Sequence, residues 1–255
     1  MDEAIKQGSY ARKQICSPSR LIAWSHRRRF ATGLALARDL AGQTVLDYGS
    51  GDGTFLAMLM DSPHAPKLAV GAEIDDRLVE DCRRRLGQRA GLQFVPAREL
   101  DRPDHAGRYD AIVCMEVLEH VVAVDALLGQ FERWLAPAGR LLVSVPVETG
   151  APLLIKQAVR HVAGWFGMGD YPGTSGYTWS ELCRSVLAGT AQHIARPVHR
   201  DPDGFESHDH KGFNWMALRA KLEQRFELLR VSASPFHWLT PHLGSQVWFV
   251  ARKKS

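Results

Sequence analysis

Short apolar runs alternate with amphipathic segments along the middle of the chain. The runs predict five strands, at 44–48, 68–74, 92–95, 109–115 and 140–147. Helices are predicted between the strands, because apolar residues there recur at intervals of three and four, as in 77–86. This alternation predicts parallel strands joined by right-handed crossovers, with helices on both faces of an open, doubly wound α/β sheet.

The chain before the first strand has a helical pattern. A helix is predicted from about 18 to 41, since Ser17 and Pro18 suit a cap and a first-turn proline. Residues 1–43 are therefore expected to form an N-terminal helical segment ahead of an α/β domain at 44–255.

The pattern changes again after the fifth strand. Between 148 and 212, Gly, Pro, His and Asp accumulate around two short helical candidates, which predicts an inserted cap on the ligand side of the sheet. After a helix that begins at Asn214, strands at 226–232 and 246–252 predict a C-terminal antiparallel hairpin at an edge of the sheet.

Composition narrows the class of protein. The 255 residues are 45% hydrophobic and 24% charged, typical of a globular protein, and no apolar stretch is long enough to span a bilayer. Four widely spaced cysteines without a CxxC pair argue against a zinc ribbon or a disulfide framework, and the polar start lacks a secretory core, so a cytoplasmic location is expected. The net charge of +4 does not by itself indicate a nucleic-acid partner, and the basic run at 26–29 is interpreted as a solvated helix face.

A glycine-rich turn follows the first strand, in the sequence LDYGSGDG at 46–53. A dinucleotide site favours GxGxxG, whereas here the third glycine comes one position earlier and Thr54 takes its place. Asp47 and Asp52 flank the turn and would repel a pyrophosphate. The same carboxylates would attract S-adenosylmethionine, which has no phosphate and carries cationic sulfonium and ammonium groups.

Further acids follow the second strand. Glu73 lies 20 positions after Gly53, at the strand end, where a carboxylate can accept hydrogen bonds from ribose hydroxyls. Asp75 is an alternative, but it could instead cap the helix that starts near Arg77.

Together with VGAEID at 70–75, YDAIVCMEVLEHV at 109–121 and LAPAGRLLVSVP at 135–146, the glycine turn resembles the class I S-adenosylmethionine-dependent methyltransferases. The match is to the small-molecule, type 11-like group and covers roughly 44–147. The resemblance implies a Rossmann-like fold with S-adenosylmethionine as the cofactor. The family often has an acid near the adenine after the third strand, but this sequence departs from the pattern there and reads FVPAREL at 94–100. Glu99 is the candidate substitute, and the recognition of the adenine stays open. The residues that the motifs and the resemblance place at the cofactor are Asp47, Gly49, Gly51, Asp52, Glu73, Asp75, Glu99, Met115 and Glu116.

Histidines are the candidates for the methyl-acceptor side. Removing a proton from a hydroxyl acceptor requires a general base. In the sequence HDHK at 208–211, His208 or His210 could be that base, with Asp209 or another acid orienting the ring, or the segment could be an exposed polar loop. A metal site is a third alternative, because histidines and carboxylates are metal ligands, but the HxH spacing alone specifies no third ligand, and no metal-ligating residue is assigned. His120 is a further catalytic candidate, although a structural role with its ring bonded to backbone is favoured.

The sequence therefore predicts methyl transfer from S-adenosylmethionine to a small-molecule hydroxyl acceptor, such as a sugar or a lipid-linked glycan intermediate. Alternatives are N-methylation of a small amine, RNA modification, or a non-catalytic binding module that keeps the fold. Nucleic-acid bases are disfavoured, since the segment at 114–117 reads CMEV and lacks a proline–aromatic motif. A basic amphipathic helix at about 152–166 leaves peripheral membrane contact open, and the oligomeric state is not determined.

Overall fold

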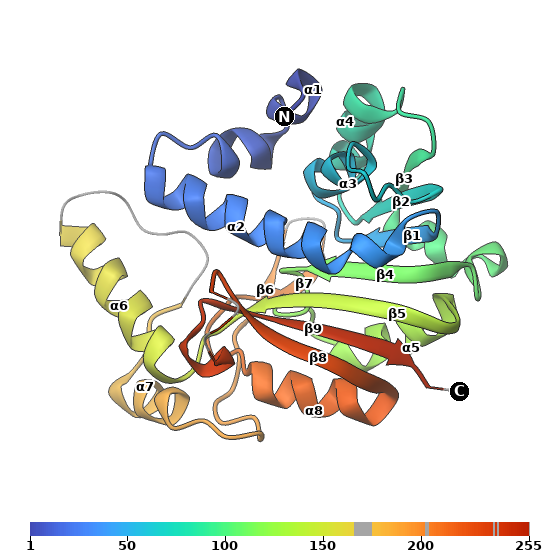
Figure 1. Cartoon of the computed structure of the whole chain (residues 1–255). Coiled ribbons are helices and arrows are strands. Elements are labelled where there is room, and N and C mark those ends of the chain that lie inside the picture. The colour runs from blue at the N-terminus through green and yellow to red at the C-terminus, as the bar shows by residue number, and fades with distance from the viewer. Residues whose placement is uncertain (166–174, 202–203, 237, 239, 255) are drawn as a thin grey trace. The chain divides into compact units, whose positions relative to one another are not determined.

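The structure, a computed structural model of the chain, describes residues 1–165, 175–201, 204–236, 238 and 240–254 (Figure 1). The chain forms two compact units. The first comprises Met1–Met115, Gly129–Val143 and Val250–Ser255, and the second comprises Glu116–Leu128 and Ser144–Phe249.

A seven-stranded sheet has the strand order β3-β2-β1-β4-β5-β9-β8. Its strands are β1 (Thr44–Tyr48), β2 (Leu68–Glu73), β3 (Leu92–Pro96), β4 (Tyr109–Met115), β5 (Leu135–Pro146), β8 (Phe226–Ser234) and β9 (Gln246–Lys253). β1 pairs in parallel with both β2 and β4, and β2 pairs in parallel with β3. The five predicted core strands are thus confirmed, and the order reverses direction at β1, as in a doubly wound sheet.

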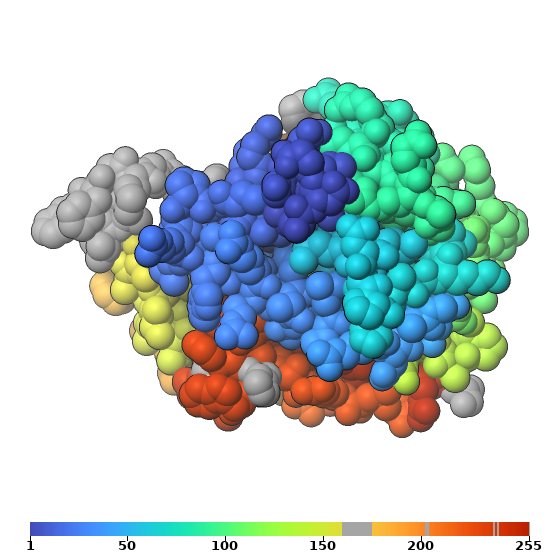
Figure 2. All heavy atoms as spheres, turned by 45° about the horizontal axis from the view of Figure 1, so that its top comes forward, coloured from blue at the N-terminus to red at the C-terminus, as the bar shows by residue number. Residues whose placement is uncertain are grey.

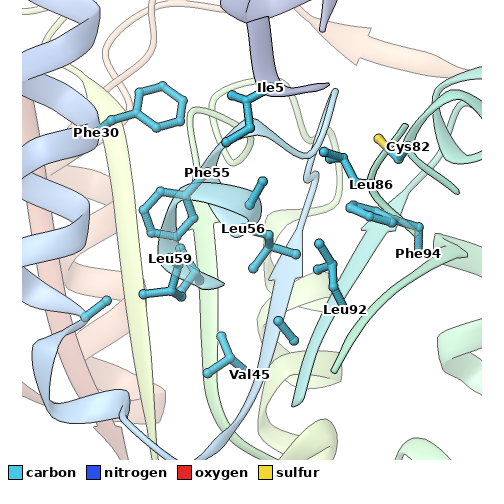
Figure 3. Close-up of a cluster of buried hydrophobic side chains, with 14 of the residues drawn as sticks. Ile5, Phe30, Val45, Phe55, Leu56, Leu59, Cys82, Leu86, Leu92 and Phe94 are labelled. Carbon is cyan, nitrogen blue, oxygen red and sulfur yellow. The ribbon is translucent and has the colours of Figure 1, made fainter. Parts of the chain in front are cut away.

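The first unit contains helices before β1 and between its strands. They are α1 (Glu3–Lys6), a π-helical turn at Ala11–Ile15, α2 (Arg20–Leu36), α3 (Thr54–Met60) and α4 (Asp76–Leu86), of which α3 and α4 contact β2 and β3. The helix α5 (Val124–Trp134) leads into β5. Buried side chains from α1 and α2, such as Ile5 and Phe30, belong to the same hydrophobic cluster as Phe55, Leu86 and Phe94 (Figure 3). The N-terminal segment therefore completes the core of this unit, and Figure 2 shows the first residues packed against α4.

Three α-helices lie wholly within the described residues of the second unit, α6 (Gly150–Trp165), α7 (Trp179–Val186) and α8 (Trp215–Arg225), and a 3₁₀ turn lies at Pro241–Leu243. Thr178 and Glu181 form a capping box at the start of α7, and Asn214 caps α8 through the amides of Met216 and Ala217. None of the described helices, in either unit, is long and apolar enough to cross a lipid bilayer.

β8 and β9 lie side by side at the sheet edge and run in opposite directions (Figure 1). The amide of Ser245 donates to the carbonyl of Ser234 at 3.1 Å, which closes the connecting loop into the predicted hairpin. A second pair of strands was not predicted. β6 (Val198–Arg200) and β7 (Glu206–His208) form a short antiparallel ribbon, whose largely exposed, mostly polar residues give no apolar pattern in the sequence.

Candidate functional site

The glycine turn between β1 and α3 depends on three residues with left-handed backbone. Gly49, Gly51 and Gly53 have φ angles of 74°, 55° and 73°. A Cβ atom at Gly53 would lie 2.7 Å from the Phe94 ring, whereas a Cβ atom at Gly51 would meet nothing within 4 Å. Gly53 is therefore required by packing, while the turn at Gly51 borders open space that a ligand can enter.

Asp47 is a buried carboxylate next to this turn. It is 1% exposed, and its Oδ2 atom has no hydrogen-bond partner in the part of the chain that the structure describes. Burial, with a smaller contribution from the nearby charge of Glu73, raises the pKa of Asp47 to about 8. An ionised carboxylate at this buried position is costly unless a cation or a hydrogen-bond donor reaches it. Asp47 therefore suits a positively charged ligand.

Glu73 ends β2 beside the same turn. Its Oε2 atom accepts a hydrogen bond from the amide of Gly51 at 2.8 Å, and its Oε1 atom accepts from the amide of Ile74 at 2.7 Å. Asp75 caps α4 instead, since its carboxylate accepts from the amide of Arg77 at 2.8 Å. Of these two acids, Glu73 is the one that lies against the glycine turn.

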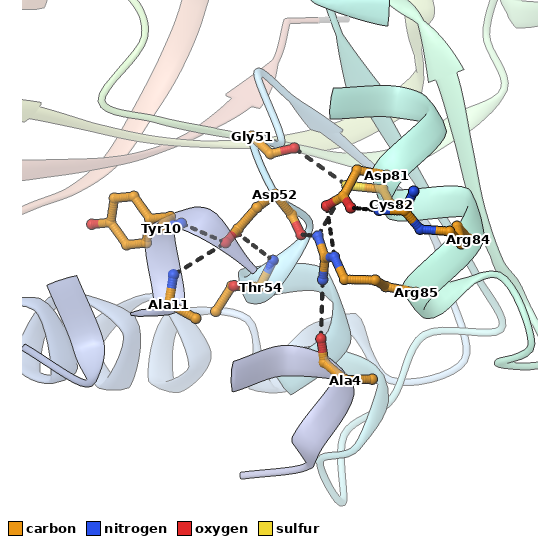
Figure 4. A network of polar contacts seen from close by, with 10 residues as sticks. All are labelled: Ala4, Tyr10, Ala11, Gly51, Asp52, Thr54, Asp81, Cys82, Arg84 and Arg85. Carbon is orange, nitrogen blue, oxygen red and sulfur yellow. Dashed lines mark hydrogen bonds and ion pairs between the residues drawn. The ribbon is translucent and has the colours of Figure 1, made fainter. Parts of the chain in front are cut away.

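The carboxylate of Asp52 holds the N-terminal segment (Figure 4). Its Oδ2 atom accepts from the amides of Tyr10 and Ala11 at 2.8 and 3.1 Å, and its Oδ1 atom accepts from the amide of Thr54 at 3.2 Å. The guanidinium of Arg85 donates to the carbonyls of Asp52 and Ala4. Asp52 was assigned to the cofactor from the sequence, but the structure shows it bonded to the backbone on both oxygens.

Glu99 is the last of the acids in the first unit that were predicted to lie at the cofactor. Glu99 lies in a 3₁₀ turn at Ala97–Asp101, is half-buried, and pairs with Arg102 at 3.3 Å. Met115 is the last residue of β4 and packs against the hydrophobic cluster of this unit.

In the second unit, Glu116 follows β4 directly and has a left-handed φ of 56°, which is uncommon for a residue with a side chain. Its carboxylate accepts from the Ser144 hydroxyl at 3.0 Å and from the Gln246 amide nitrogen at 3.1 Å. The backbone amide of Glu116 also donates to the carbonyl of Ser144. These bonds stabilise the strained conformation and fix the start of the segment that carries His120.

The three candidate histidines meet in the second unit. His120 Nδ1 donates to the carbonyl of His208 at 2.9 Å, and the amide of His208 donates back to the carbonyl of His120 at 2.9 Å. The ring of His210 stands at 84° to that of His120, with 4.9 Å between centroids. The structure thus places the expected ring-to-backbone bond on His120, and it brings together histidines that are about 90 positions apart.

Burial changes the protonation of two of these rings. It lowers the pKa of His208, and it lowers the pKa of His210 to about 4. His208 Nδ1 lies 2.7 Å from the carbonyl of Pro197, which can only accept, so in the neutral ring Nε2 keeps its lone pair. Both rings are therefore neutral at neutral pH and able to accept a proton or bind a cation.

Asp209 does not orient its neighbouring histidines, contrary to the sequence interpretation. Its carboxylate accepts from the amides of Ser175 and Lys211 at 2.6 and 2.9 Å, and it lies 3.4 Å from His199 Nε2. The acid beside His120 and His210 is Glu119, which is fully buried and was not among the residues named from the sequence. Its position next to His120 in the segment YDAIVCMEVLEHV at 109–121 was the available signal.

Comparisons with known proteins agree with these features. The family model for a methyltransferase domain matches residues 23–184. A ubiquinone biosynthesis O-methyltransferase of Marinobacter nauticus is 31% identical over 107 residues, which cover 41% of this chain and 44% of that protein. A demethylmenaquinone methyltransferase of Clavibacter sepedonicus is 34% identical over 116 residues, 45% of each chain. The matches thus span less than half the length of these two relatives.

A solved structure has a similar fold. The magnesium protoporphyrin IX methyltransferase of Synechocystis, solved with bound SAH, superposes with a TM-score of 0.55 at 17% identity. The superposition covers 91% of this chain and 85% of that one. The likeness supports the Rossmann-like architecture of the sheet.

Proposed function

The chain belongs to the methyltransferase domain family, and from that premise we propose that it transfers the methyl group of S-adenosylmethionine to a hydroxyl oxygen of a small molecule. The observation that carries the proposal is the buried carboxylate of Asp47 beside a glycine turn that borders open space. A cationic, phosphate-free ligand would stabilise that carboxylate, whereas a nucleotide phosphate would be repelled by it.

The residues of the first unit divide the binding of the cofactor. Asp47 would face its ammonium group, and the backbone at Gly49 and Gly51 would lie along the methionyl portion. Glu73 would accept hydrogen bonds from the ribose hydroxyls, a role for which its position at the end of β2 is suited. Glu99, in the turn after β3, remains proposed for the adenine side, and Met115, the last residue of β4, for the lining of the cofactor pocket. S-adenosylmethionine supplies a methyl group on a positively charged sulfur that leaves as a neutral thioether.

The residues of the second unit would serve the acceptor. The acceptor oxygen forms a bond to the methyl carbon while the carbon–sulfur bond breaks and its electron pair stays on sulfur. The hydroxyl proton must go to a base, and we assign it to His208 Nε2, which is unprotonated because Nδ1 donates to Pro197. His120 would position His208 through the paired bonds between them.

A hydroxyl acceptor is supported by the names of relatives such as the O-methyltransferase of Marinobacter nauticus. Phenols, sugars and lipid-linked glycans all carry suitable hydroxyls. The acceptor class is tested by supplying labelled S-adenosylmethionine with phenolic, sugar and amine acceptors in parallel. If the labelled methyl group appears in an amine but in no hydroxyl compound, the proposed O-methylation is wrong and the activity is N-methylation.

Binding of S-adenosylhomocysteine, measured by calorimetry, tests the cofactor assignment. We expect Asp47→Asn and Glu73→Gln each to weaken binding by at least about tenfold, since each removes a charged hydrogen-bond partner. Asp104→Asn is a matched control, because that carboxylate is 66% exposed and its ion pair with Arg108 is long, at 3.9 Å. Equal affinity in all four proteins would overturn the assignment.

A further inference from the structure

We propose that Glu119, His120 and His210 bind a divalent first-row transition-metal ion. One ligand atom from each of these side chains lies within 4.8 Å of those of the other two, and all three residues belong to the second unit. In tetrahedral coordination, two atoms that each lie about 2.1 Å from the ion are about 3.4 Å apart. Side-chain movements of about 1 Å would therefore bring the three ligand atoms to coordinating distance.

The chemistry of the donors matches such an ion. Two imidazoles and one carboxylate are typical ligands of Zn²⁺, Mn²⁺, Fe²⁺ or Co²⁺, whereas Ca²⁺ and Mg²⁺ favour sites made only of oxygen. Three protein ligands leave coordination positions open, as in catalytic rather than structural metal sites.

The protonation of the histidines is suited to binding a cation. His120 donates from Nδ1 to the carbonyl of His208, so in the neutral ring the lone pair of Nε2 is available, and that atom lies 3.9 Å from Glu119 Oε1. A backbone carbonyl on the second ring nitrogen is the usual support of a metal-bound histidine. The Nδ1 atom of His210 is buried, and none of the described residues hydrogen-bonds to it.

Other contacts hold the two ligand-bearing segments together. The guanidinium of Arg196 donates to the carbonyl of Glu119 and, at 2.8 Å, to the carbonyl of Asp209. Burial lowers the pKa of Arg196 to about 10, which still leaves it cationic at neutral pH. Arg196 thus connects the backbone of Glu119 to the backbone next to His210.

Neighbouring acids are already bound elsewhere. Glu116 accepts from Ser144 and Gln246, and Glu148, 2% exposed, pairs with Lys156 at 2.8 Å. Among the described residues, the proposed site thus consists of the three protein ligands Glu119, His120 and His210.

Binding of the ion stands on these contacts alone, but its role rests on the proposed function. An acceptor oxygen in an open position would have its pKa lowered by the metal, so its proton would pass more easily to His208. A second oxygen on the same acceptor would fix its orientation, which favours vicinal hydroxyls or a hydroxyl beside a carbonyl.

The test is a titration of the full chain, first treated with a chelator, with Zn²⁺ followed by calorimetry and with Co²⁺ followed by visible absorption. We expect one equivalent to bind, with Co²⁺ bands that indicate nitrogen ligands. Glu119→Gln keeps the side-chain volume, and His210→Ala removes a donor; each should weaken binding by more than about tenfold. His64→Ala, which removes an exposed histidine of the first unit, should bind as the wild type does.

Each result decides the proposal. Wild-type protein that shows no Co²⁺ nitrogen bands, or Glu119→Gln and His210→Ala with unchanged affinity, would overturn it. Circular dichroism identifies a variant that fails to fold, and the wild-type Co²⁺ spectrum remains decisive if both do. Methyl transfer that persists with chelator would exclude a role of the metal in catalysis but leave the proposed function in place. Metal binding without any methyl transfer would support the metal site but contradict the proposed function.

Discussion

The carboxylate of Asp52 accepts a hydrogen bond from the backbone amide of Tyr10 at 2.8 Å, across 42 positions of the chain. The same oxygen accepts from the amide of Ala11, and Arg85 connects the carbonyl of Ala4 to that of Asp52 (Figure 4). The first eleven residues are thereby bound to the glycine turn proposed to hold the cofactor, so the order of the turn depends on the N-terminal segment.

Asp52→Ala should release this segment. The change leaves the amides of Tyr10 and Ala11 without their acceptor, which costs about 1–3 kcal/mol of the free energy of unfolding. Hydrogen exchange should show faster exchange at these two amides, while amides in β2 and β4 keep their protection. Exchange that is unchanged at Tyr10 and Ala11 would show that the contact is not needed to hold the segment.

Asp47→Asn should stabilise the free protein in a pH-dependent way. The pKa of Asp47 is about 8 in the folded state and about 3.9 unfolded, so between these values the folded state binds the extra proton. Its contribution therefore makes the wild type less stable as pH rises through this window, by at most about 1.4 kcal/mol per pH unit. Since asparagine does not titrate, the stability advantage of the variant should be absent near pH 4 and largest above pH 8.

Denaturation of the wild type and of Asp47→Asn at several pH values measures this difference in stability. The contributions of the other titrating groups cancel in the difference, because both proteins contain them. Saturating S-adenosylhomocysteine should reverse the order of stability, since only the wild type offers a carboxylate to the ammonium group. Parallel stability curves across the window would contradict the buried, ionisable state of Asp47.

Gly51→Ala and Gly53→Ala should separate binding from packing. Both residues have positive φ, so each alanine costs about 1–2 kcal/mol in backbone strain. At Gly53 the added methyl also meets Phe94 and Leu86 within 2.8 Å, which adds about 1–3 kcal/mol. Of the two variants, Gly51→Ala should lose less of the free energy of unfolding. It should nevertheless bind S-adenosylhomocysteine poorly, because its methyl group enters the space of the ligand.

Urea unfolding and calorimetry on the two variants measure these effects side by side. If Gly51→Ala binds S-adenosylhomocysteine as tightly as the wild type, then the open space beside that residue is not part of the cofactor site.

His208→Gln should lower the rate of methyl transfer by about 10²–10⁴-fold, because glutamine cannot take the acceptor proton. The affinity for S-adenosylhomocysteine should not change, since no cofactor contact is assigned to this ring. His64→Gln serves as the control, and single-turnover rates are the appropriate measurement. A rate within about threefold of the wild type would exclude His208 as the base.

The sequence by itself determined the architecture of the sheet and the polarity of its ligand. Strands and helices alternate locally, and the hydrophobic period of each short segment is sufficient to predict its type, so 44–48 and 109–115 were predicted with the bounds that the structure has. The glycine turn and Asp47 are adjacent in the chain, and their charge could be compared with a pyrophosphate without any tertiary information. The same local reasoning identified Asn214 as the start of a helix.

Only the tertiary structure decided which polar groups meet. From the sequence, Asp52 is predicted to bind the cofactor. In the structure, its carboxylate accepts hydrogen bonds from amides about 40 positions away. Asp209 was expected beside the histidines, but its carboxylate binds backbone amides. The acid that lies beside His120 and His210 is Glu119. His120 and His210 come together through the β6–β7 ribbon, which has no apolar pattern to predict it. Side-chain partners set by long-range packing leave no local periodicity, and so the fold followed from the sequence whereas the composition of the histidine cluster did not.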